Sequence, residues 1–241
     1  MAEQAAYKRV LVKISGQSLC APGGYGIAAQ AVMATVAELK AAHGMGVQIA
    51  LVVGGGNFFR GKALSEAPFI ERPTADAMGM LATVINALAL QDALESEGVP
   101  ARVLSAIPTA GVCEPFVRRR AVRHLEKGRV VILAGGTGSP FFTTDTCAAL
   151  RASELGAEVM MKATKVDGVF EADPVQHPGA KKFERLTYAE MLARQLGVMD
   201  LAAVSLCMES RIPMIVFRLG QAGNLAAAAR GEHVGTIISS D

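Results

Sequence analysis

Glycine-rich turns beside charged residues are the part of this sequence best suited to chemistry. Among the 25 glycines in 241 residues, several fall in three short groups, at Gly16, Gly54–Gly56 and Gly135–Gly138. Each group follows a short, β-branched apolar run that predicts a buried strand. Glycine lets the backbone approach an anion closely and turn its N–H groups toward it. The three groups together therefore predict a site that binds several phosphates.

Lysine and aspartate residues accompany these turns. Lys13 interrupts an apolar run just before Gly16, and Lys162 and Lys165 follow another such run. An edge-strand lysine facing water would show the same pattern as Lys13, but its place beside the turn favours a phosphate contact. Asp145 stands at the predicted start of a helix, where an acid also complements the helix dipole. Lysines, hydroxyls and glycine turns without a nucleophile motif are typical of phosphoryl transfer, which depends on positioning and charge neutralisation.

Two familiar phosphate-binding motifs do not fit the glycine groups. A dinucleotide fingerprint needs a third glycine where the sequence has Phe59, and Phe141 stands at the same place in the later group. The segment Gly56–Lys62 matches most of a Walker A motif, but Ala63 replaces the hydroxyl residue that would hold magnesium. Neither a Rossmann dehydrogenase nor a P-loop kinase is therefore supported.

Composition and charge narrow the class of protein. Hydrophobic residues make up 51% of the chain and charged residues 19%, with a formal net charge of +2. That much apolar side chain offsets the entropy lost on ordering, which excludes a disordered chain. The small basic excess argues against a nucleic-acid partner. The cysteines and histidines show no metal-ligand spacing, and no signal or membrane segment is evident, so we expect a cytoplasmic protein without a membrane partner or a protein metal site.

Short apolar runs alternate with helical patterns along the chain. Strands are predicted over 8–14, 47–53, 101–104, 129–133, 158–161 and 214–217, and helices over 28–43, 74–97, 118–127 and 144–155. A capping box at 187–190 begins a further helix. This alternation is typical of a parallel sheet covered on both faces, whose strands bind ligands at their carboxyl ends. We expect an α/β protein, a three-layer αβα sandwich around a mostly parallel sheet, in one domain over 1–241.

The segment Arg118–Arg120 begins a basic cluster that could be mistaken for a binding site. Arg119, Arg123 and Lys127 share one face of the predicted helix by their i,i+4 spacing. Because the net charge of the chain is near zero, a solvated or subunit-contact face is the favoured interpretation.

Six segments of the sequence carry a resemblance to a known family. They are Lys13–Gly16, Val53–Gly61, Ala75–Thr83, Gly136–Asp145, Lys162–Gly168 and Val198–Asp200. Through them the sequence resembles the bacterial uridylate kinases of the amino-acid kinase fold family over essentially its whole length. The first and fifth segments are shared in looser form with carbamate, acetylglutamate and aspartate kinases, whereas the third and fourth are specific to the uridylate kinase branch. The resemblance implies the amino-acid kinase fold and transfer of the ATP γ-phosphoryl group to UMP in pyrimidine nucleotide biosynthesis.

The resemblance also implies a role for individual residues. ATP would contact Lys13, Ile14, Ser15, Gly16, Gly56, Arg60, Thr164, Phe170 and Asp173. UMP would contact Gly55, Asp76, Thr137, Gly138, Ser139, Pro140, Phe141, Phe142, Thr143 and Thr144, with Asp76 accepting from the ribose hydroxyls. The expected catalytic set is Lys13, Asp145, Lys162, Lys165 and Asp200. In that set Asp145 would orient the lysines, Asp200 would help to order the ATP side, and Mg²⁺ would arrive with ATP.

Regulation and assembly follow from the same resemblance. An N-terminal lobe of about 1–155 would bind UMP and a C-terminal lobe of about 156–241 would bind ATP. The residues Ala21, Pro22, Gly23, Gly24, Tyr25 and Gly26 match the place of a GTP effector loop. Members of this branch are homohexamers activated by GTP and inhibited by UTP, which implies the same here. Gln17 replaces a usual glutamate, Phe170 replaces a frequent tyrosine, and Ala21–Pro22 is an unusual start to the effector loop.

Two other functions remain open at this point. The chain could be an amino-acid kinase that phosphorylates a carboxylate or a carbamate, or a catalytically silent nucleotide-binding regulator on the same fold. Asp76 and the segment 137–144 argue against the first, and Lys13 with Asp145 argues against the second.

Overall fold

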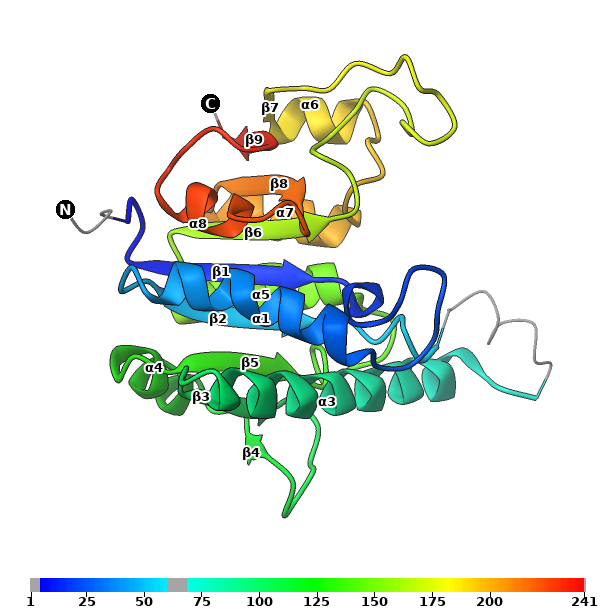
Figure 1. Cartoon of the computed structure of the whole chain (residues 1–241). Coiled ribbons are helices and arrows are strands. Elements are labelled where there is room, and N and C mark those ends of the chain that lie inside the picture. Colours follow the sequence, from blue (N-terminus) through cyan, green and yellow to red (C-terminus); the bar gives the residue numbers. More distant parts are fainter. Residues whose placement is uncertain (1–4, 60–68, 241) are drawn as a thin grey trace.

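A computed structural model describes residues 5–59 and 69–240, and its centre is one twisted sheet (Figure 1). In this part of the chain the sheet has nine strands in the order β4-β3-β5-β2-β1-β6-β8-β9-β7. The strands are β1 (Arg9–Ile14), β2 (Gln48–Val53), β3 (Ala101–Ser105), β4 (Glu114–Pro115), β5 (Val130–Ala134), β6 (Val159–Thr164), β7 (Arg185–Thr187), β8 (Met214–Arg218) and β9 (Thr236–Ser239). All neighbouring strands run parallel except β8 and β9, which are antiparallel. The mostly parallel sheet is confirmed.

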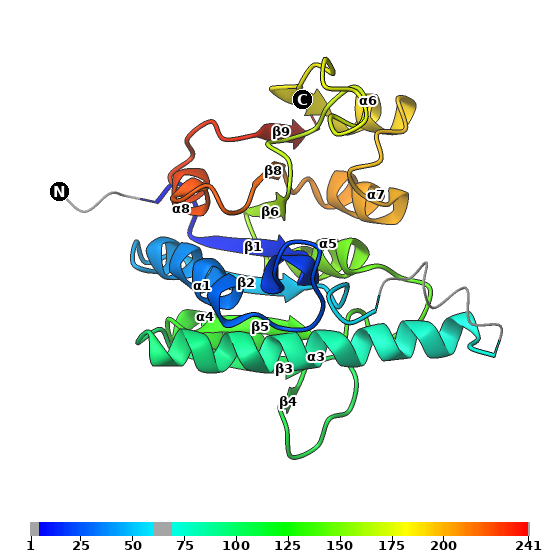
Figure 2. The ribbon, with the colours of Figure 1, turned by 45° about the vertical axis from the view of Figure 1, so that its right-hand side comes forward.

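Helices cover both faces of this sheet, as the two views in Figures 1 and 2 show. They are α1 (Ala29–His43), α3 (Arg72–Ser96), α4 (Arg118–Glu126), α5 (Thr144–Leu155), α6 (Tyr188–Ala193), α7 (Leu201–Ser210) and α8 (Asn224–Ala229), with a short 3₁₀ helix η1 (Gly16–Leu19). Helices α1, α3 and α8 pack on one face, and α4, α5 and α7 pack on the other. The predicted three-layer αβα sandwich is therefore confirmed.

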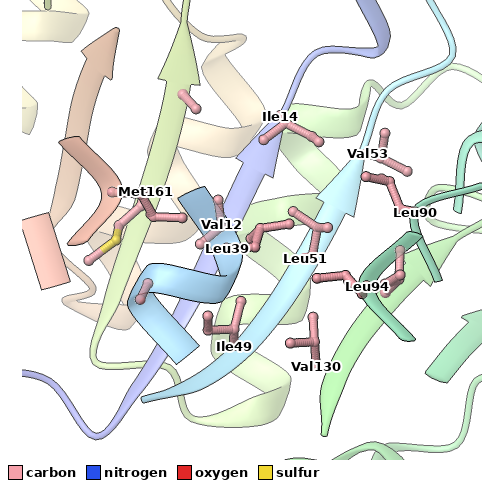
Figure 3. Close-up of a cluster of buried hydrophobic side chains, with 14 of the residues drawn as sticks. Val12, Ile14, Leu39, Ile49, Leu51, Val53, Leu90, Leu94, Val130 and Met161 are labelled. Atoms are coloured by element: carbon pink, nitrogen blue, oxygen red, sulfur yellow. The ribbon is translucent and has the colours of Figure 1, made fainter. Parts of the chain in front are cut away.

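The central strands divide their side chains between two cores. On β1, Val12 and Ile14 point to the face covered by α1 and α3, where Leu39 and Leu90 also lie (Figure 3). Leu11 points to the opposite face, toward α5 and α7. Because successive side chains alternate along a strand, Lys13 shares the face of Leu11. The sheet thereby directs this lysine toward the first turn of α5.

By its length and composition alone, helix α3 is long and apolar enough to cross a membrane. No such stretch is expected from the sequence. The helix lies along the sheet (Figure 2), where Ala87, Leu90 and Leu94 are fully buried. Its apolar character therefore serves the core, and Leu81 and Ile85 remain about half exposed on its outer side.

One sheet runs through both predicted lobes. Strand β1 pairs with β2 on one side and with β6 on the other, although β6 follows the proposed boundary near residue 155. The predicted lobes are therefore joined by hydrogen bonds between two central strands, β1 and β6. Their division into a UMP-binding and an ATP-binding lobe stays a prediction.

Candidate active site

The three glycine groups lie at the carboxyl ends of three adjacent strands in the interior of the sheet. They follow β1, β2 and β5, which are neighbours in the order β5-β2-β1 and run parallel. The first two turns touch, because a Cβ on Gly16 would lie 2.4 Å from the carbonyl oxygen of Gly54. A Cβ on Gly55 would lie 2.7 Å from the Gly79 carbonyl of α3. Glycine is therefore required here by close packing of backbone on backbone, a reason that adds to the predicted approach of an anion.

Two lysines and one aspartate form a compact cluster beside these turns. Lys13 on β1 and Lys162 on β6 occupy paired positions of neighbouring strands. The Lys13 Nζ lies 2.7 Å from Asp145 Oδ1, and the Lys162 Nζ donates to Asp145 Oδ2 at 2.5 Å. The lysines are 9% and 8% exposed. The edge-strand alternative for Lys13 is thus wrong, and the cluster holds a net positive charge at the carboxyl ends of the strands.

The charges in this cluster alter one another's protonation. Burial alone would raise the pKa of Asp145, but the ammonium groups of Lys13 and Lys162 outweigh it and hold the pKa below its ordinary value. Burial also lowers the pKa of Lys162, and the Asp145 carboxylate opposes that effect. The carboxylate therefore stays ionised and keeps both ammonium groups in place, as expected for a residue that orients the lysines.

The N-terminus of α5 carries the carboxylate of this cluster. The Thr143 hydroxyl caps the helix by accepting from the N–H groups of Asp145 and Thr146. Asp200 begins α7 and accepts hydrogen bonds from the hydroxyls of Thr143 and Thr146. These contacts hold the first turn of α5, and the expected role of Asp200 on the ATP side stays a prediction. Asp200 is therefore a support for Thr143 and the neighbouring Asp145.

A cavity of about 780 Å³ opens beside Thr143 and Thr144. Its described lining residues are Gly55, Gly56, Phe59, Ile70, Arg72, Ala75, Asp76, Gly79, Met80, Thr83, Gly136, Thr137, Ser139, Phe142, Thr143 and Thr144. Most residues predicted for UMP are among them, together with Gly56 from the predicted ATP set. Gly138, Pro140 and Phe141 belong to the same segment but do not line the cavity. We call this space the larger cavity.

Asp76 already has partners in this cavity wall. Its Oδ2 accepts from the Phe141 N–H at 2.8 Å and lies 3.8 Å from Nε of Arg72. The Arg72 guanidinium lies 5.1 Å from the centre of the Phe141 ring. Phe141 has a φ of 73°, a left-handed conformation that a bulky residue adopts only when its surroundings hold it there. Asp76 therefore anchors the segment that forms the outer wall of the larger cavity.

Two polar residues of α3 are hydrogen-bonded to the glycine turns, and the sequence analysis assigns neither of them a role, although Thr83 ends one segment of the family resemblance. The Thr83 hydroxyl accepts from the Gly135 N–H at 2.8 Å. The Asn86 side chain donates to the Gly54 carbonyl at 2.8 Å and exchanges two hydrogen bonds with Asn57. Both α3 residues are buried. The only signal in the sequence is a polar residue among the apolar positions of a long helix.

A second cavity, of about 450 Å³, lies next to η1 and the end of β6. Its described lining residues are Gln17, Ser18, Cys20, Pro22, Gly23, Gly24, Ala31, Ala34, Thr35, Thr164, Lys165, Leu219 and Gly220. Two of these lining residues are hydrogen-bonded, since Lys165 donates to Gln17 Oε1 at 2.8 Å. A Cβ on Gly56 would have the Gln17 side chain as its nearest neighbour, at 3.9 Å, so a lining residue of the larger cavity lies next to a lining residue of this one. We call this space the smaller cavity.

The smaller cavity brings together residues that the resemblance assigns to different ligands. Pro22, Gly23 and Gly24 of the predicted effector loop share its wall with Thr164 of the predicted ATP set. Tyr25 is exposed and packs edge-on against Phe58, with ring centres 5.8 Å apart. Three residues of the loop therefore form part of a cavity wall, and the role of the loop as an effector site stays a prediction.

Most of the residues predicted for ATP are not among the described lining residues of either cavity. Lys13–Gly16 lie at the end of β1 and in the turn that follows it, and three others lie elsewhere or beyond description. Phe170 forms an isolated bridge with Lys182, and the Asp173 carboxylate accepts from the Val175 N–H in a turn. Neither is among the described lining residues. Arg60 lies outside the described residues.

Protein ligands for a metal ion are scarce near the cluster. Within 5–59 and 69–240, no group of three or more His, Cys, Asp or Glu side chains is placed to hold a metal ion. Both oxygens of Asp145 face lysine ammonium groups. The described residues therefore do not form a carboxylate cage of the kind a protein-held divalent cation requires.

Comparison with known proteins identifies the family. A model of the amino acid kinase family matches residues 8–218. The UMP kinase from Bacillus anthracis has 38% sequence identity and a TM-score of 0.94, over 98% of this chain and 97% of that one. The UMP kinase from Ureaplasma parvum has 34% identity and a TM-score of 0.90, over 99% of this chain and 100% of that one. The uridylate kinase from Archaeoglobus fulgidus has 29% identity and a TM-score of 0.74, over 95% of this chain and 99% of that one. The chain therefore belongs to the amino acid kinase family and is similar along nearly its whole length to these UMP kinases.

Proposed function

We propose that this protein transfers the γ-phosphoryl group of ATP to UMP, giving UDP and ADP. The observation that carries the proposal is the Lys13–Asp145–Lys162 cluster, two of whose members stand within two residues of the lining of one cavity each. Asp145 directly follows Thr144 of the larger cavity, and Lys162 lies two residues before Thr164 of the smaller one. Similarity to UMP kinases supports UMP as the acceptor.

The two cavities suit two nucleotides. We assign UMP to the larger one, the acceptor cavity, because most residues predicted for UMP line it and its volume is that of an ordinary small-molecule site. Its phosphate would lie near Thr143, Thr144 and the first N–H groups of α5, which favour an anion. We assign ATP to the smaller one, the donor cavity, with its phosphates reaching the lysine cluster past Gln17 and Gly56.

Charge neutralisation is the main chemical task. The UMP phosphate is already an anionic nucleophile, so no general base is needed. Two unit charges 4 Å apart repel by about 4 kcal/mol at an effective dielectric of 20. Lys162 donates to both Asp145 and the Val198 carbonyl, whereas Lys13 contacts Asp145 and keeps more N–H donors for a phosphate. Lys13 would therefore bind the transferring group, while Lys162 would add charge and hold Asp145.

Magnesium enters this proposal as part of the Mg·ATP substrate. The described residues offer no cage of carboxylates, and Mg²⁺ is commonly bound by nucleotide oxygens and water. The protein's own contribution is to hold two ammonium groups and the backbone N–H groups of the turns where negative charge develops.

We also propose the regulation and assembly implied by the resemblance. GTP would activate and UTP would inhibit, and the contact of Pro22–Gly24 with the donor cavity supports an effect of that loop on ATP binding. A cytoplasmic homohexamer without nucleic-acid or membrane partners completes the proposal. Leu81 and Ile85, exposed and four residues apart on α3, support a subunit contact there. Light scattering after size exclusion measures the assembly.

A coupled assay of ADP release tests the function. Purified protein is given Mg·ATP with UMP, CMP, dTMP or acetylglutamate, each with and without GTP and UTP. We expect turnover with UMP far above the other acceptors. Activity with acetylglutamate alone would favour a carboxylate kinase, and binding of nucleotides without turnover on any acceptor would favour a silent regulator. Either outcome contradicts the proposal.

A further inference from the structure

The turn Gly54–Gly56 lies between the lining residues of the two cavities, and it has no side chain of its own to hold its shape. Gly55 and Gly56 line the acceptor cavity, and Gly56 adjoins Gln17 of the donor cavity. Glycine loses more conformational freedom on folding than other residues, so three in succession need restraints from outside. The question is which groups supply them.

A buried pair of asparagines provides the restraint. Asn57 and Asn86 are 2% and 0% exposed. The Asn57 Nδ2 donates to Asn86 Oδ1 at 2.9 Å, and the Asn86 Nδ2 donates back to Asn57 Oδ1 at 2.7 Å. Such a reciprocal amide pair fixes the orientation of both side chains, because each amide has its donor and its acceptor engaged.

The remaining donors of the pair reach two other segments. The Asn86 Nδ2 donates to the Gly54 carbonyl at 2.8 Å, and the Asn57 Nδ2 donates to the Gly26 carbonyl at 2.8 Å. The Gly26 N–H returns a bond to the Asn57 carbonyl at 2.9 Å. The pair therefore ties α3, the glycine turn and the end of the 21–26 loop into one hydrogen-bonded unit.

Asparagine is the residue type that this arrangement requires at position 86. An apolar side chain would leave the Gly54 carbonyl, the Asn57 Oδ1 and one Asn57 N–H without the partners that Asn86 supplies, in a dry environment where unpaired polar groups are costly. An ionised aspartate could accept from Asn57 but could not donate to Gly54. A protonated aspartic acid could donate one hydrogen bond, so it would restore part of the contact.

From these contacts we infer that Asn86, acting through Asn57 and Gly54, is a positioning residue for the proposed phosphoryl transfer. It touches neither nucleotide in the proposed arrangement and instead fixes the turn at which the two substrates meet. Small displacements of reacting groups lower turnover strongly, so loss of Asn86 should reduce kcat more than it changes either KM. The inference rests on the proposed function.

The experiment compares Asn86→Leu and Asn86→Asp with a matched control, Thr236→Val. Thr236 is also fully buried, accepts from the Val169 N–H and donates to the Phe183 carbonyl, but lines neither cavity. We expect Asn86→Leu to lower kcat at least tenfold, and Thr236→Val to stay within twofold at a comparable loss of Tm. Hydrogen exchange of a Val53–Phe58 peptide should speed up in Asn86→Leu and not in Thr236→Val.

The pH dependence of activity in the Asn86→Asp variant is a second readout, and a purely structural role for Asn86 would not change it. Asn86→Asp should recover activity relative to the wild type as the pH falls and the buried carboxylic acid becomes a donor. It also keeps the test available if Asn86→Leu fails to fold. An Asn86→Leu kcat equal to that of the control, or an Asn86→Asp to wild-type ratio that is flat with pH, overturns the inference. If the wild type does not phosphorylate UMP, the proposed function fails. Independently of activity, an unchanged hydrogen-exchange rate of the Val53–Phe58 peptide in the Asn86 variants would overturn the positioning role.

Discussion

The acceptor and donor cavities are built in different ways. The acceptor cavity is formed by glycine turns whose backbone is bound by Thr83 and Asn86, both buried on α3. The lining of the donor cavity includes Lys165 and Gln17, which share an exposed hydrogen bond, and the segment Pro22–Gly24, whose first two residues are exposed.

This difference separates fixed geometry from adjustable geometry. A buried backbone turn with satisfied hydrogen bonds moves only at high cost, whereas an exposed contact between long side chains is weak and readily exchanged with water. We therefore expect substitutions to be most damaging in the shared cluster, damaging for one substrate in the acceptor cavity, and mild in the donor cavity.

Lys13→Ala should have the largest effect, because it removes charge where both nucleotides meet. Removing one preorganised donor to a developing anion commonly lowers turnover by about 10²–10³-fold. We expect a fall in kcat of at least about 100-fold, with both KM values changed little. The coupled assay measures this, and circular dichroism checks the fold, since the Asp145–Lys162 contact remains. Near-normal turnover would remove Lys13 from its assigned role.

Asp145→Asn should have the next largest effect, and chiefly on stability. It leaves two buried ammonium groups without their counter-ion, and breaking a buried ion pair in this way costs about 3 kcal/mol or more. Urea unfolding at pH 7 measures the loss. Asp76→Asn serves as a control, because the Asp76 carboxylate is 33% exposed. Its free energy of unfolding should change much less.

The pH dependence of stability gives Asp145 a second signature. Its folded-state pKa is lowered, so the stability that it contributes is fully present above its unfolded pKa, about 3.9, and is lost as the pH falls through the folded value. The stability gap between the wild type and Asp145→Asn should therefore narrow below about pH 4. A gap that stays constant down to pH 2 would contradict the ion-pair explanation.

Asp76→Ala should act on one cavity alone. It removes the acceptor of the Phe141 N–H and the oxygens proposed for the ribose hydroxyls. Loss of charge-assisted hydrogen bonds predicts a KM for UMP raised by about tenfold or more, with the KM for ATP within about twofold. Initial-rate kinetics over both substrates decide this. An equal rise in both KM values would show that the two cavities are not independent.

Lys165→Ala should have the smallest effect of the series. Its contact with Gln17 is exposed, and exposed polar contacts of this kind are worth about 1 kcal/mol or less. We expect the KM for ATP to rise by at most about fivefold and kcat to hold. A loss as large as that of Lys13→Ala would show that the donor cavity is as fixed as the acceptor cavity.

Much of the fold and the centre of the site can be predicted from the sequence. The six predicted strands correspond to β1, β2, β3, β5, β6 and β8, because short β-branched apolar runs bounded by glycine and polar residues are a strong local signal. The short strands β4, β7 and β9 carry no such run, and neighbouring strands alone determine their pairing. Lys13 can be predicted because a charge inside an apolar strand is conspicuous.

The supporting residues are harder to find for a physical reason. On a helix such as α3, a polar residue usually marks the solvent face, so Thr83 and Asn86 look ordinary in the sequence. Their importance arises from what lies opposite them, the Gly135 N–H and the Gly54 carbonyl, which are distant in sequence. By contrast, three basic residues that are conspicuous in the sequence are exposed: Arg119 and Arg123 on α4, and Lys127 at its C-cap.

The paired positions of Lys13 and Lys162 have one more consequence. Adjacent strands of a sheet are held about 4.8 Å apart by their hydrogen bonds, so the spacing of the two ammonium stems is set by a repeat distance of the polypeptide. Loops between the two strands could lengthen, shorten or change composition without altering that interval. The separation of the two positive charges is thus set by the spacing of the strands. Only a change in the register of β1 against β6 would alter it.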